Sequence, residues 1–354
     1  MSILFIGTGK KGNYAYTAAR VKAKKSKLLK KDDYSKMLMM SVPEICNYIS
    51  DTGYAKEMVD FANKYSGIEL LEHATYANMA KAFHSILLAS SGELYDAVLA
   101  YLERWDYNNL RTILRAKSFG DDGDRIREDL APVGKLDMDD MNRIIAAPDI
   151  DEALNVFTSI VHVKIPAELV TEYKETGILG PLEDHLMKMY YRGLLQKVGT
   201  STRPSSIFRD YIRSEIDLTN LSVVLKLKSE GVIGDKVMEF YIPGCKEIDE
   251  KMMAQLAAAP DMETLAPMLT QLSVYEDIKE FFEGENKSMI EADCGIRSYK
   301  HVRTSKFSHM YPLSILPVVD YMLNKEIEVG NVRKIARGIE SNLDMNTINN
   351  LLVI

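Results

Sequence analysis

The chain has 354 residues, a formal net charge of −7 and a pI of about 5.6. This length can form two or three compact units, and the acidic balance argues against a dedicated nucleic-acid-binding protein. The longest apolar runs fall short of the roughly 20 residues that a membrane-spanning helix needs, and the first residues lack the pattern of a secretory signal, so we expect a soluble intracellular protein. Cys46, Cys245 and Cys294 are widely separated and are expected to be reduced and mostly buried, without a zinc site. Helical periodicity with little strand-like alternation predicts an all-α fold.

Gly7, Gly9 and Gly12 form a GxGxxG sequence after an apolar run at the N-terminus. In a dinucleotide-binding protein such glycines join a strand to a helix, and an acid about 20 residues further on, here Asp32 or Asp33, binds the ribose. Residues 26–50 instead predict a helix, a turn and a helix, so we interpret the glycines as part of a flexible segment. A nucleotide-binding enzyme that uses Gly7 to Gly12 is one alternative hypothesis, which dinucleotide binding by a Gly9 variant would test.

The next residues, 10–36, carry ten Lys or Arg side chains against Asp32 and Asp33. A basic amphipathic helix of this kind could touch an acidic protein or lipid headgroups. A solvated helix face accounts for the same residues.

A proline followed by an acid recurs at residues 43–44, 148–149 and 260–261, at nearly equal intervals along the chain. Proline is tolerated at the first helical position, and an acid there lies favourably against the helix dipole. The sequence therefore predicts three equivalent helix starts with an architectural role.

Residues 71–88 and 182–198 predict two long helices, each forming a hairpin with the helix that follows it. A third hairpin is expected within residues 298–339, shortened or kinked by Pro312 and Pro317. Residues 118–145 and 229–257 are expected to hold loops between shorter helices. Residues 339–354 predict a final short helix that can cap the last repeat.

A motif of an acid, an asparagine three places later, two aliphatic residues and a base occurs three times, and the interval between successive copies is the same. The aliphatic residues fall on one helical face, and the acid is predicted to accept free N–H groups in the first turn of its helix, as an N-cap does. The spacing predicts three helical repeats over residues 1–117, 118–228 and 229–354. The motif residues are Asp106, Asn109, Leu110 and Arg115; Asp217, Asn220, Leu221 and Lys226; and Glu328, Asn331, Val332 and Arg337.

The sequence lacks the residue patterns that are typical of catalytic and metal-binding sites. The histidines lack the spacing of metal ligands, and neither a serine nor a cysteine lies in a recognisable nucleophile motif. The repeated acids are what a structural role predicts, since an active site usually occurs once per core. We expect a protein without a catalytic, cofactor or metal site; the histidines are His73, His84, His162, His185, His301 and His309.

Four segments resemble the C subunit of the archaeal-type (A-type) rotary ATP synthase, which is homologous to the d subunit of the vacuolar proton pump. They are YAYTAARVKAKKSKLL near the N-terminus, YNNLRTILRAK, SEIDLTNLSVVLKLK and NKEIEVGNVRKIARG. The resemblance covers essentially the whole chain. It departs from the family in the leader before Tyr14, in Glu328 where the other copies have Asp, and in Gly330 within the last motif.

The resemblance implies a non-catalytic central-stalk subunit made of three helical domains in a pseudo-threefold funnel, without a cofactor. Its wide part would rest on the proteolipid rotor ring at the cytoplasmic face of the cell membrane, and its cavity would receive the central-shaft subunits. It would then transmit torque between proton translocation and ATP synthesis as a peripheral membrane protein that does not bind nucleic acid. A helical-repeat adaptor scaffold unrelated to ATP synthases is a second alternative, although common solenoid repeats run about 20–50 residues and this repeat is domain-sized.

Overall fold

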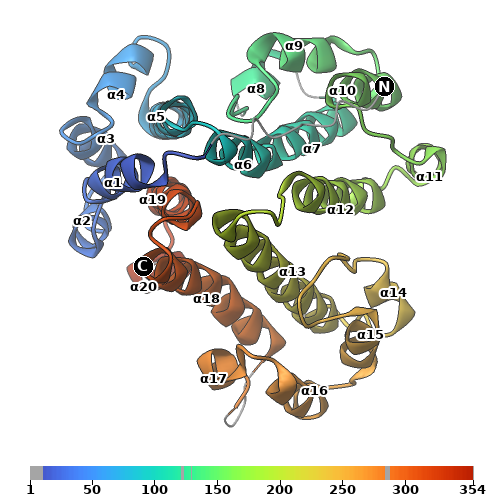
Figure 1. Cartoon of the computed structure of the whole chain (residues 1–354). Helices are drawn as coiled ribbons and strands as arrows, with labels where there is room; N and C mark the ends of the chain where they lie inside the picture. The colour runs from blue at the N-terminus through green and yellow to red at the C-terminus, as the bar shows by residue number, and fades with distance from the viewer. Residues whose placement is uncertain (1–10, 121–122, 129, 284–287, 354) are drawn as a thin grey trace. The chain divides into compact units, whose positions relative to one another are not determined.

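The computed structural model describes residues 11–120, 123–128, 130–283 and 288–353. Within these ranges every regular element is a helix and no strand occurs, which confirms the all-α prediction (Figure 1). Of the N-terminal glycines, Gly7 and Gly9 lie outside the described residues. No helix in the described ranges combines the length and the apolar character that crossing a membrane requires.

The chain divides into two compact units. Unit 1 comprises Met1–Leu182 and Pro317–Ile354, and unit 2 comprises Glu183–Leu316. Unit 1 thus contains both ends of the chain. Its helices are α1 (Tyr14–Lys25), α2 (Lys31–Met37), α3 (Val42–Ser50), α4 (Ala55–Phe61), α5 (Gly67–Ala89), α6 (Glu93–Leu102), α7 (Arg104–Phe119), α8 (Gly123–Glu128), α9 (Met138–Ala146), α10 (Ile150–Val161), α11 (Ala167–Thr176), nearly all of α19 (Leu316–Glu340), and α20 (Met345–Leu351).

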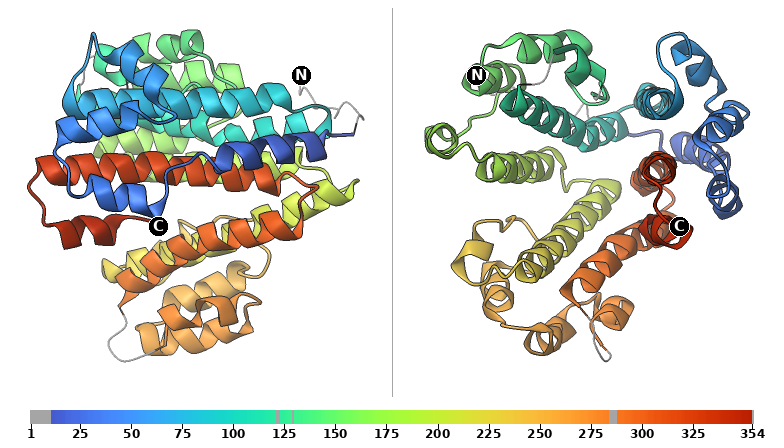
Figure 2. Two further views of the ribbon diagram at one scale, coloured as in Figure 1. Left: turned by 90° about the vertical axis from the view of Figure 1, so that its left-hand side faces the viewer. Right: turned by 180° about the vertical axis from the view of Figure 1, so that it is seen from behind.

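The last helices of unit 1 pack among the first ones, and Figure 2 shows α19 running beside the N-terminal helices. Val332, Ile335 and Ala336 on α19 and Ile348 on α20 join a core whose other members come from α2 to α5. An ion pair of 2.7 Å between Lys25 on α1 and Asp320 on α19 adds a polar contact. One of the basic N-terminal residues is therefore engaged inside the protein. The other buried members of this core are Tyr34, Met37, Ile45, Ile49, Tyr54, Met58, Ile68, Leu71 and Ala74.

Unit 2 is built around α13 and α18, which are its most extensively packed pair of helices (Figure 1). Both contribute apolar side chains to one core, for example Leu221 and Val224 from α13 and Ile296 from α18. Short helices complete this core. The helices of unit 2 are most of α12 (Gly180–Lys197), then α13 (Arg203–Ser229), α14 (Asp235–Met238), α15 (Glu250–Ala258), α16 (Met262–Met268), η1 (Leu269–Gln271), α17 (Tyr275–Ile278), η2 (Lys279–Phe281) and α18 (Met289–Met310).

The predicted long helices are present as α5 and α12, but the prediction that the third pair is shortened or kinked is wrong. Helices α18 and α19 contain 22 and 25 residues. Pro312 lies in the turn between them, and Pro317 is the second residue of α19, where a proline needs no N–H partner. The predicted final helix is present as α20.

The proline–acid pairs mark three helix starts, as predicted, but the proline occupies the first turn in only one of them. Pro43 lies in the first turn of α3, whose N-cap is Ser41. In the other two starts the acid itself is the N-cap: Asp149 accepts from the Glu152 N–H, and Asp261 accepts from the Thr264 N–H. Their prolines consequently precede the helix.

Candidate functional site

Each asparagine of the motif forms a pair of hydrogen bonds with one backbone residue 22 positions further along the chain. Asn109 donates to the Ala131 carbonyl at 2.6 Å and accepts from its N–H at 3.0 Å. Asn220 pairs in the same way with Ile242, at 2.9 Å for both bonds. Asn331 pairs with Val353 at 2.7 and 3.1 Å. An amide side chain can donate and accept at once, so each asparagine holds a loop by both of its backbone groups.

The acids of the first two copies bind backbone N–H groups in a loop that precedes a short helix, α9 for Asp106 and α15 for Asp217. Asp106 accepts from the Lys135 and Leu136 N–H groups at 2.8 and 3.1 Å. Asp217 accepts from three consecutive N–H groups, of residues 246–248, at 2.9 to 3.2 Å. Burial raises the pKa of Asp217 above its usual value, and the three N–H donors oppose that rise.

The predicted N-cap role is wrong for Asp217 and Glu328, whereas Asp106 lies in the first turn of α7 as predicted but accepts from loop N–H groups. Asp217 lies in the interior of α13 and Glu328 in the interior of α19, where each backbone N–H is already bonded within the helix. Loop N–H groups have no such partner, so the buried carboxylates bind them instead. Gly134 precedes the loop residues that Asp106 binds, and a Cβ atom there would overlap the Asp106 carboxylate.

The third acid, Glu328, receives two of its three donors from the N-terminal part of the chain and one from its own helix. It accepts from the Leu29 N–H at 2.5 Å, from the Tyr54 hydroxyl and from the Lys325 ammonium at 2.7 Å. Burial and then the charge of Glu328 raise the pKa of Tyr54 well above its usual value. The N-terminal segment thus completes the contacts of the last copy of the motif.

The remaining motif residues separate into a buried set and an exposed set. Leu110, Leu221 and Val332 are fully buried in the cores. Arg115, Lys226 and Arg337 are not buried, and Arg337 binds both carboxylate oxygens of Glu72.

Two lysines with a role in this motif were not singled out from the sequence. Lys117 donates to the carbonyls of Ile145 and Ala147, and Lys228 donates to the carbonyls of Ala257 and Ala259. Burial lowers the pKa of both lysines. Each lysine follows the base of its copy by two positions, and this repetition could have identified them. The third copy has Ile339 at the same position, packed against the apolar core of unit 1.

Histidines and cysteines are scattered over the two units. Within the ranges that the structure describes, no group of three or more His, Cys, Asp or Glu side chains is placed to hold a metal ion. Cys46 and Cys245 are half-buried but Cys294 is exposed, which corrects the prediction of mostly buried thiols. His84, His162, His185, His73, His301 and His309 all lie outside the buried cores.

Comparison with known proteins identifies the family. The family described as ATP synthase (C/AC39) subunit matches residues 17–351. The chain is 33% identical over 348 residues to the A-type ATP synthase C subunit from Methanococcoides burtonii, covering 98% of this chain and 96% of the relative. It is 34% identical over 352 residues to the A-type ATP synthase C subunit from Archaeoglobus fulgidus, covering 99% of both chains. The corresponding protein from Haloferax volcanii is 30% identical over 354 residues, with 97% of this chain and 98% of the relative covered.

These matches confirm the resemblance noted in the sequence, and they identify a structural subunit of an ATP synthase rather than its catalytic one. The chain belongs to the ATP synthase (C/AC39) subunit family.

Proposed function

We propose that this chain is a central-stalk subunit of an A-type rotary ATP synthase. In this role it couples the central shaft to the proteolipid rotor ring at the cytoplasmic face of the membrane during proton-driven ATP synthesis. The observation that carries the proposal is full-length similarity to C subunits of A-type ATP synthases, together with an acid–asparagine motif that is used three times.

The proposal includes three helical domains, residues 1–117, 118–228 and 229–354, arranged as a funnel around a pseudo-threefold axis. Support comes from the asparagine contacts, which span 22 residues in every copy. Further support comes from the contacts between Glu328 and the N-terminal segment, because a ring of repeats needs its last member joined to its first.

A mechanical coupling requires that the helices keep their shape under load. In this chain each motif ties a long helix to other segments through hydrogen bonds between a carboxylate or amide side chain and backbone groups, and such bonds are costly to leave unmade where the groups are buried. The motif residues therefore act as positioning residues for the surfaces that meet the shaft and the ring.

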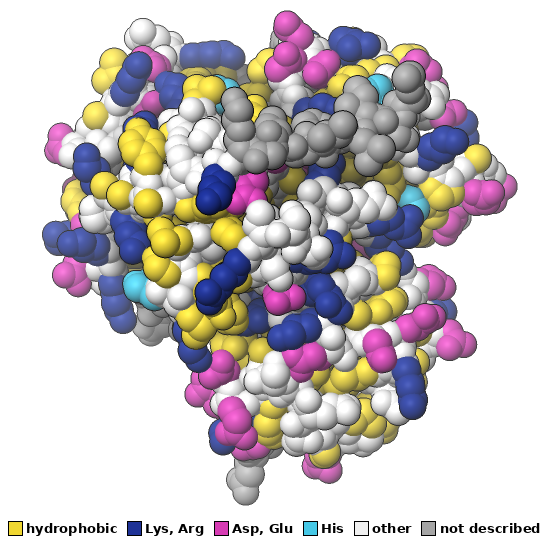
Figure 3. Space-filling view, in the orientation of Figure 1, with side chains coloured by type: hydrophobic (Ala, Val, Ile, Leu, Met, Phe, Trp, Pro, Cys, Tyr) yellow, Lys and Arg dark blue, Asp and Glu magenta, His cyan; other side chains and the backbone are white. Residues whose placement is uncertain are grey.

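The surface seen in Figure 3 suits reversible polar docking, because basic and acidic side chains are interspersed on this face. Complementary charges fix the register of two partners and speed their association, and added salt screens them. We therefore expect the contact with the shaft to weaken as the salt concentration rises.

Co-purification with a salt series tests the proposal. A tagged chain, made in cells that contain the complex, is isolated from detergent-solubilised membranes and is expected to bring down shaft and ring subunits. The Kd for the purified shaft is then measured between about 0.05 and 0.5 M salt, where the Debye length falls from about 14 to 4 Å, and we expect it to rise at least about tenfold. The same tagged chain, mixed with a lysate that lacks the complex, is the control.

Two results would contradict the proposal. Recovery of the tagged chain without shaft or ring subunits would remove it from the central stalk and favour an unrelated adaptor. A Kd that stays constant across the salt series would remove the polar docking step.

A further inference from the structure

Helices α1 and α2 carry basic side chains that have no acidic partner in the structure. Between residues 20 and 36, Lys25 is engaged in an ion pair with Asp320. The exposed Lys and Arg side chains of this stretch form no ion pair with any residue in the described ranges. We call them the basic face, and they are Arg20, Lys22, Lys27, Lys30, Lys31 and Lys36.

The two helices that carry the basic face are fixed to the body of unit 1. Only residues 26–30 separate α1 from α2, so the basic side chains of both helices lie close together. The Leu29 N–H in this linker donates to Glu328 at 2.5 Å, and Lys25 at the end of α1 pairs with Asp320 at 2.7 Å. The protein therefore holds these cations near one another on its surface.

Positive charge is concentrated in this region. Burial and then the neighbouring positive charges, that of Arg20 first, lower the pKa of Lys24. Of the two acids in the stretch, Asp33 accepts from the Lys30 N–H and from the Tyr48 hydroxyl, which keeps it within the fold. A basic surface on a chain whose net charge is −7 favours an anionic partner, because the partner would relieve the repulsion between the cations.

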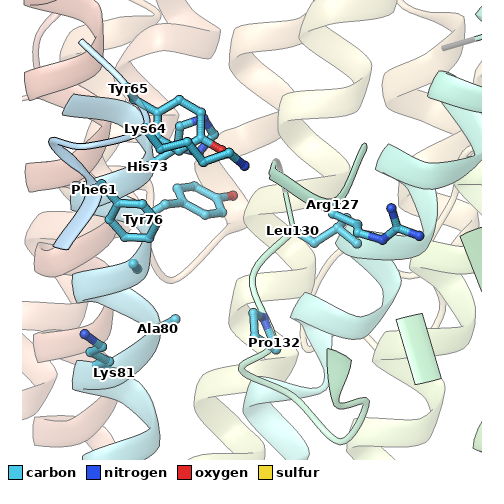
Figure 4. Close-up of a pocket in the computed structure, with 11 residues that line it drawn as sticks. Phe61, Lys64, Tyr65, His73, Tyr76, Ala80, Lys81, Arg127, Leu130 and Pro132 are labelled. Atoms are coloured by element: carbon cyan, nitrogen blue, oxygen red, sulfur yellow. The ribbon is translucent and has the colours of Figure 1, made fainter. Parts of the chain in front are cut away.

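The cavity drawn in Figure 4 shows the contrasting case of basic groups that are already engaged. It lies in unit 1 and has a volume of about 750 Å³. Lys81 belongs to its lining, and its ammonium lies 2.9 Å from the Glu57 carboxylate and 3.7 Å from that of Asp60. An anion would have to displace these carboxylates there, whereas the basic face requires no such exchange.

The composition of the basic face favours lipid headgroups over an acidic protein. All of its members except Arg20 are lysines, whose ammonium suits a phosphate as a point charge, whereas arginine is preferred where a carboxylate is bound by two parallel hydrogen bonds. Tyr16 lies one turn before Arg20, is 58% exposed, and accepts a hydrogen bond of 3.4 Å from it. Tyrosine is enriched at the interface between membrane and water.

We propose that the basic face binds the phosphodiester headgroups of anionic lipids, with the Tyr16 ring reaching the headgroup layer. Lysines on a helix at a membrane surface are attracted by anionic lipids, and an aromatic ring on the same face adds apolar contact. The proposal concerns lipid and not the proteolipid ring, so it can fail while the central-stalk function holds.

Sedimentation with vesicles tests the proposal on the purified full chain. Vesicles of equal parts phosphatidylglycerol and phosphatidylcholine are expected to bind the chain at least about tenfold more tightly than vesicles of phosphatidylcholine alone. Raising the salt from about 0.05 to 0.5 M is expected to abolish this preference, because it shortens the Debye length from about 14 to 4 Å. Neither the shaft nor the ring is present in this measurement.

A matched pair of triple variants connects the binding to the basic face. The combination of Lys22→Gln, Lys27→Gln and Lys31→Gln is expected to weaken binding to the anionic vesicles at least about tenfold, since each lysine at such a surface contributes roughly fivefold. The control combines Lys56→Gln, Lys236→Gln and Lys251→Gln, which are exposed lysines outside the basic face. It changes the net charge by the same amount and is expected to bind as the parent does. Far-UV circular dichroism checks that both variants keep their helices.

The proposal fails if the chain does not bind the anionic vesicles, or if it binds both kinds of vesicle equally. It fails as well if the two triple variants bind the anionic vesicles with the same affinity, because net charge rather than the basic face would then govern binding. A basic-face variant that binds vesicles as the parent does but loses affinity for the purified shaft would assign these lysines to an acidic protein surface and overturn the lipid assignment.

Discussion

At the residue scale, Asn220 and Asn331 make the same pair of hydrogen bonds in different surroundings. Asn220 and its partner Ile242 are both buried. Asn331 is buried too, but its partner Val353 is only half-buried near the end of the chain. Water can therefore replace the amide of Asn331 more easily than that of Asn220.

This difference predicts unequal effects of the same substitution. Asn220→Ala leaves the N–H and carbonyl of Ile242 buried without partners, at about 1–3 kcal/mol for each group, so we expect the free energy of unfolding to fall by about 2–6 kcal/mol. Asn331→Ala is expected to cost about half as much. Urea unfolding followed by far-UV circular dichroism measures both values.

Asn155→Ala provides the control, because Asn155 is exposed on α10 and its side-chain hydrogen bond to Glu152 is long at 3.4 Å. Its effect is expected to stay within about 0.5 kcal/mol. Equal losses for Asn220→Ala and Asn331→Ala would refute the account based on burial.

The sequence was enough to find the motif residues but not to predict their partners. An evenly spaced repeat identifies Asp106, Asp217 and Glu328 as equivalent positions, whereas the backbone N–H groups that they bind lie in loops that carry no periodic pattern. The loop is 29 to 31 residues away in the first two copies, and in the third it lies near the opposite end of the chain. Local spacing therefore suggested an N-cap, while the buried acids bind loop N–H groups that only tertiary structure brings to them.

At the element scale, α13 and α18 in unit 2 meet along a seam that contains ionisable side chains. Lys300 on α18 donates to the Thr219 hydroxyl on α13 at 2.9 Å, with the carboxylates of Glu215 and Asp293 nearby. Further along, the Tyr211 and Thr304 hydroxyls share a hydrogen bond of 2.8 Å. Burial, which outweighs the two carboxylates, lowers the pKa of Lys300 to about 8.

The depressed pKa predicts that unit 2 gains stability as the pH rises. Between about pH 8 and 10.5 the unfolded chain holds the Lys300 proton more often than the folded chain, so the free energy of unfolding increases with pH in that window. With about 1.4 kcal/mol for each pKa unit, the gain relative to Lys300→Met is expected to reach about 2–3 kcal/mol. Urea unfolding at several pH values, followed by circular dichroism, measures this difference.

Lys306→Met is the matched control, because Lys306 is exposed on the same helix and the carboxylate of Asp277 is 3.5 Å from its ammonium. This variant is expected to keep the pH dependence of the parent chain. A parent chain and Lys300→Met with parallel pH profiles would show that Lys300 is not desolvated in the seam.

Element type was predictable from periodicity, but proline positions needed the structure. The apolar spacing that predicted long helices around residues 71–88 and 182–198 reflects real buried stripes. Pro312 and Pro317 were misplaced because a proline in a turn, or in the first helical turn, leaves the same sequence pattern as one that breaks a helix. Pro148 and Pro260 were also misplaced: each lies one residue before an acidic N-cap, a position that the sequence pattern does not distinguish from the first helical turn.

At the scale of the whole molecule, the two compact units divide the spectroscopic signals unevenly. Trp105 belongs to unit 1, whereas helices that contribute to circular dichroism occur in both. A chain with two compact units need not unfold in a single transition. The two probes can therefore distinguish the units.

We expect Asn220→Ala to shift the urea midpoint followed by circular dichroism while it leaves the tryptophan midpoint in place, because Asn220 lies in unit 2. Asn331→Ala lies in unit 1 and is expected to shift the tryptophan midpoint. Coincident curves from both probes in the parent and in both variants would show that the chain unfolds as one cooperative block.

The contacts of Glu328 with Leu29 and Tyr54 join segments of the chain that are synthesised early and late in translation. Helices α2, α3 and α4 leave the ribosome early, but Val332, Ile335 and Ala336, which cover part of their apolar surface, are added only after α5 to α18 have been synthesised. The apolar surface of α2, α3 and α4 therefore stays partly exposed until α19 has been synthesised, and a nascent chain that stops before α19 exposes an apolar N-terminal surface that is prone to aggregation.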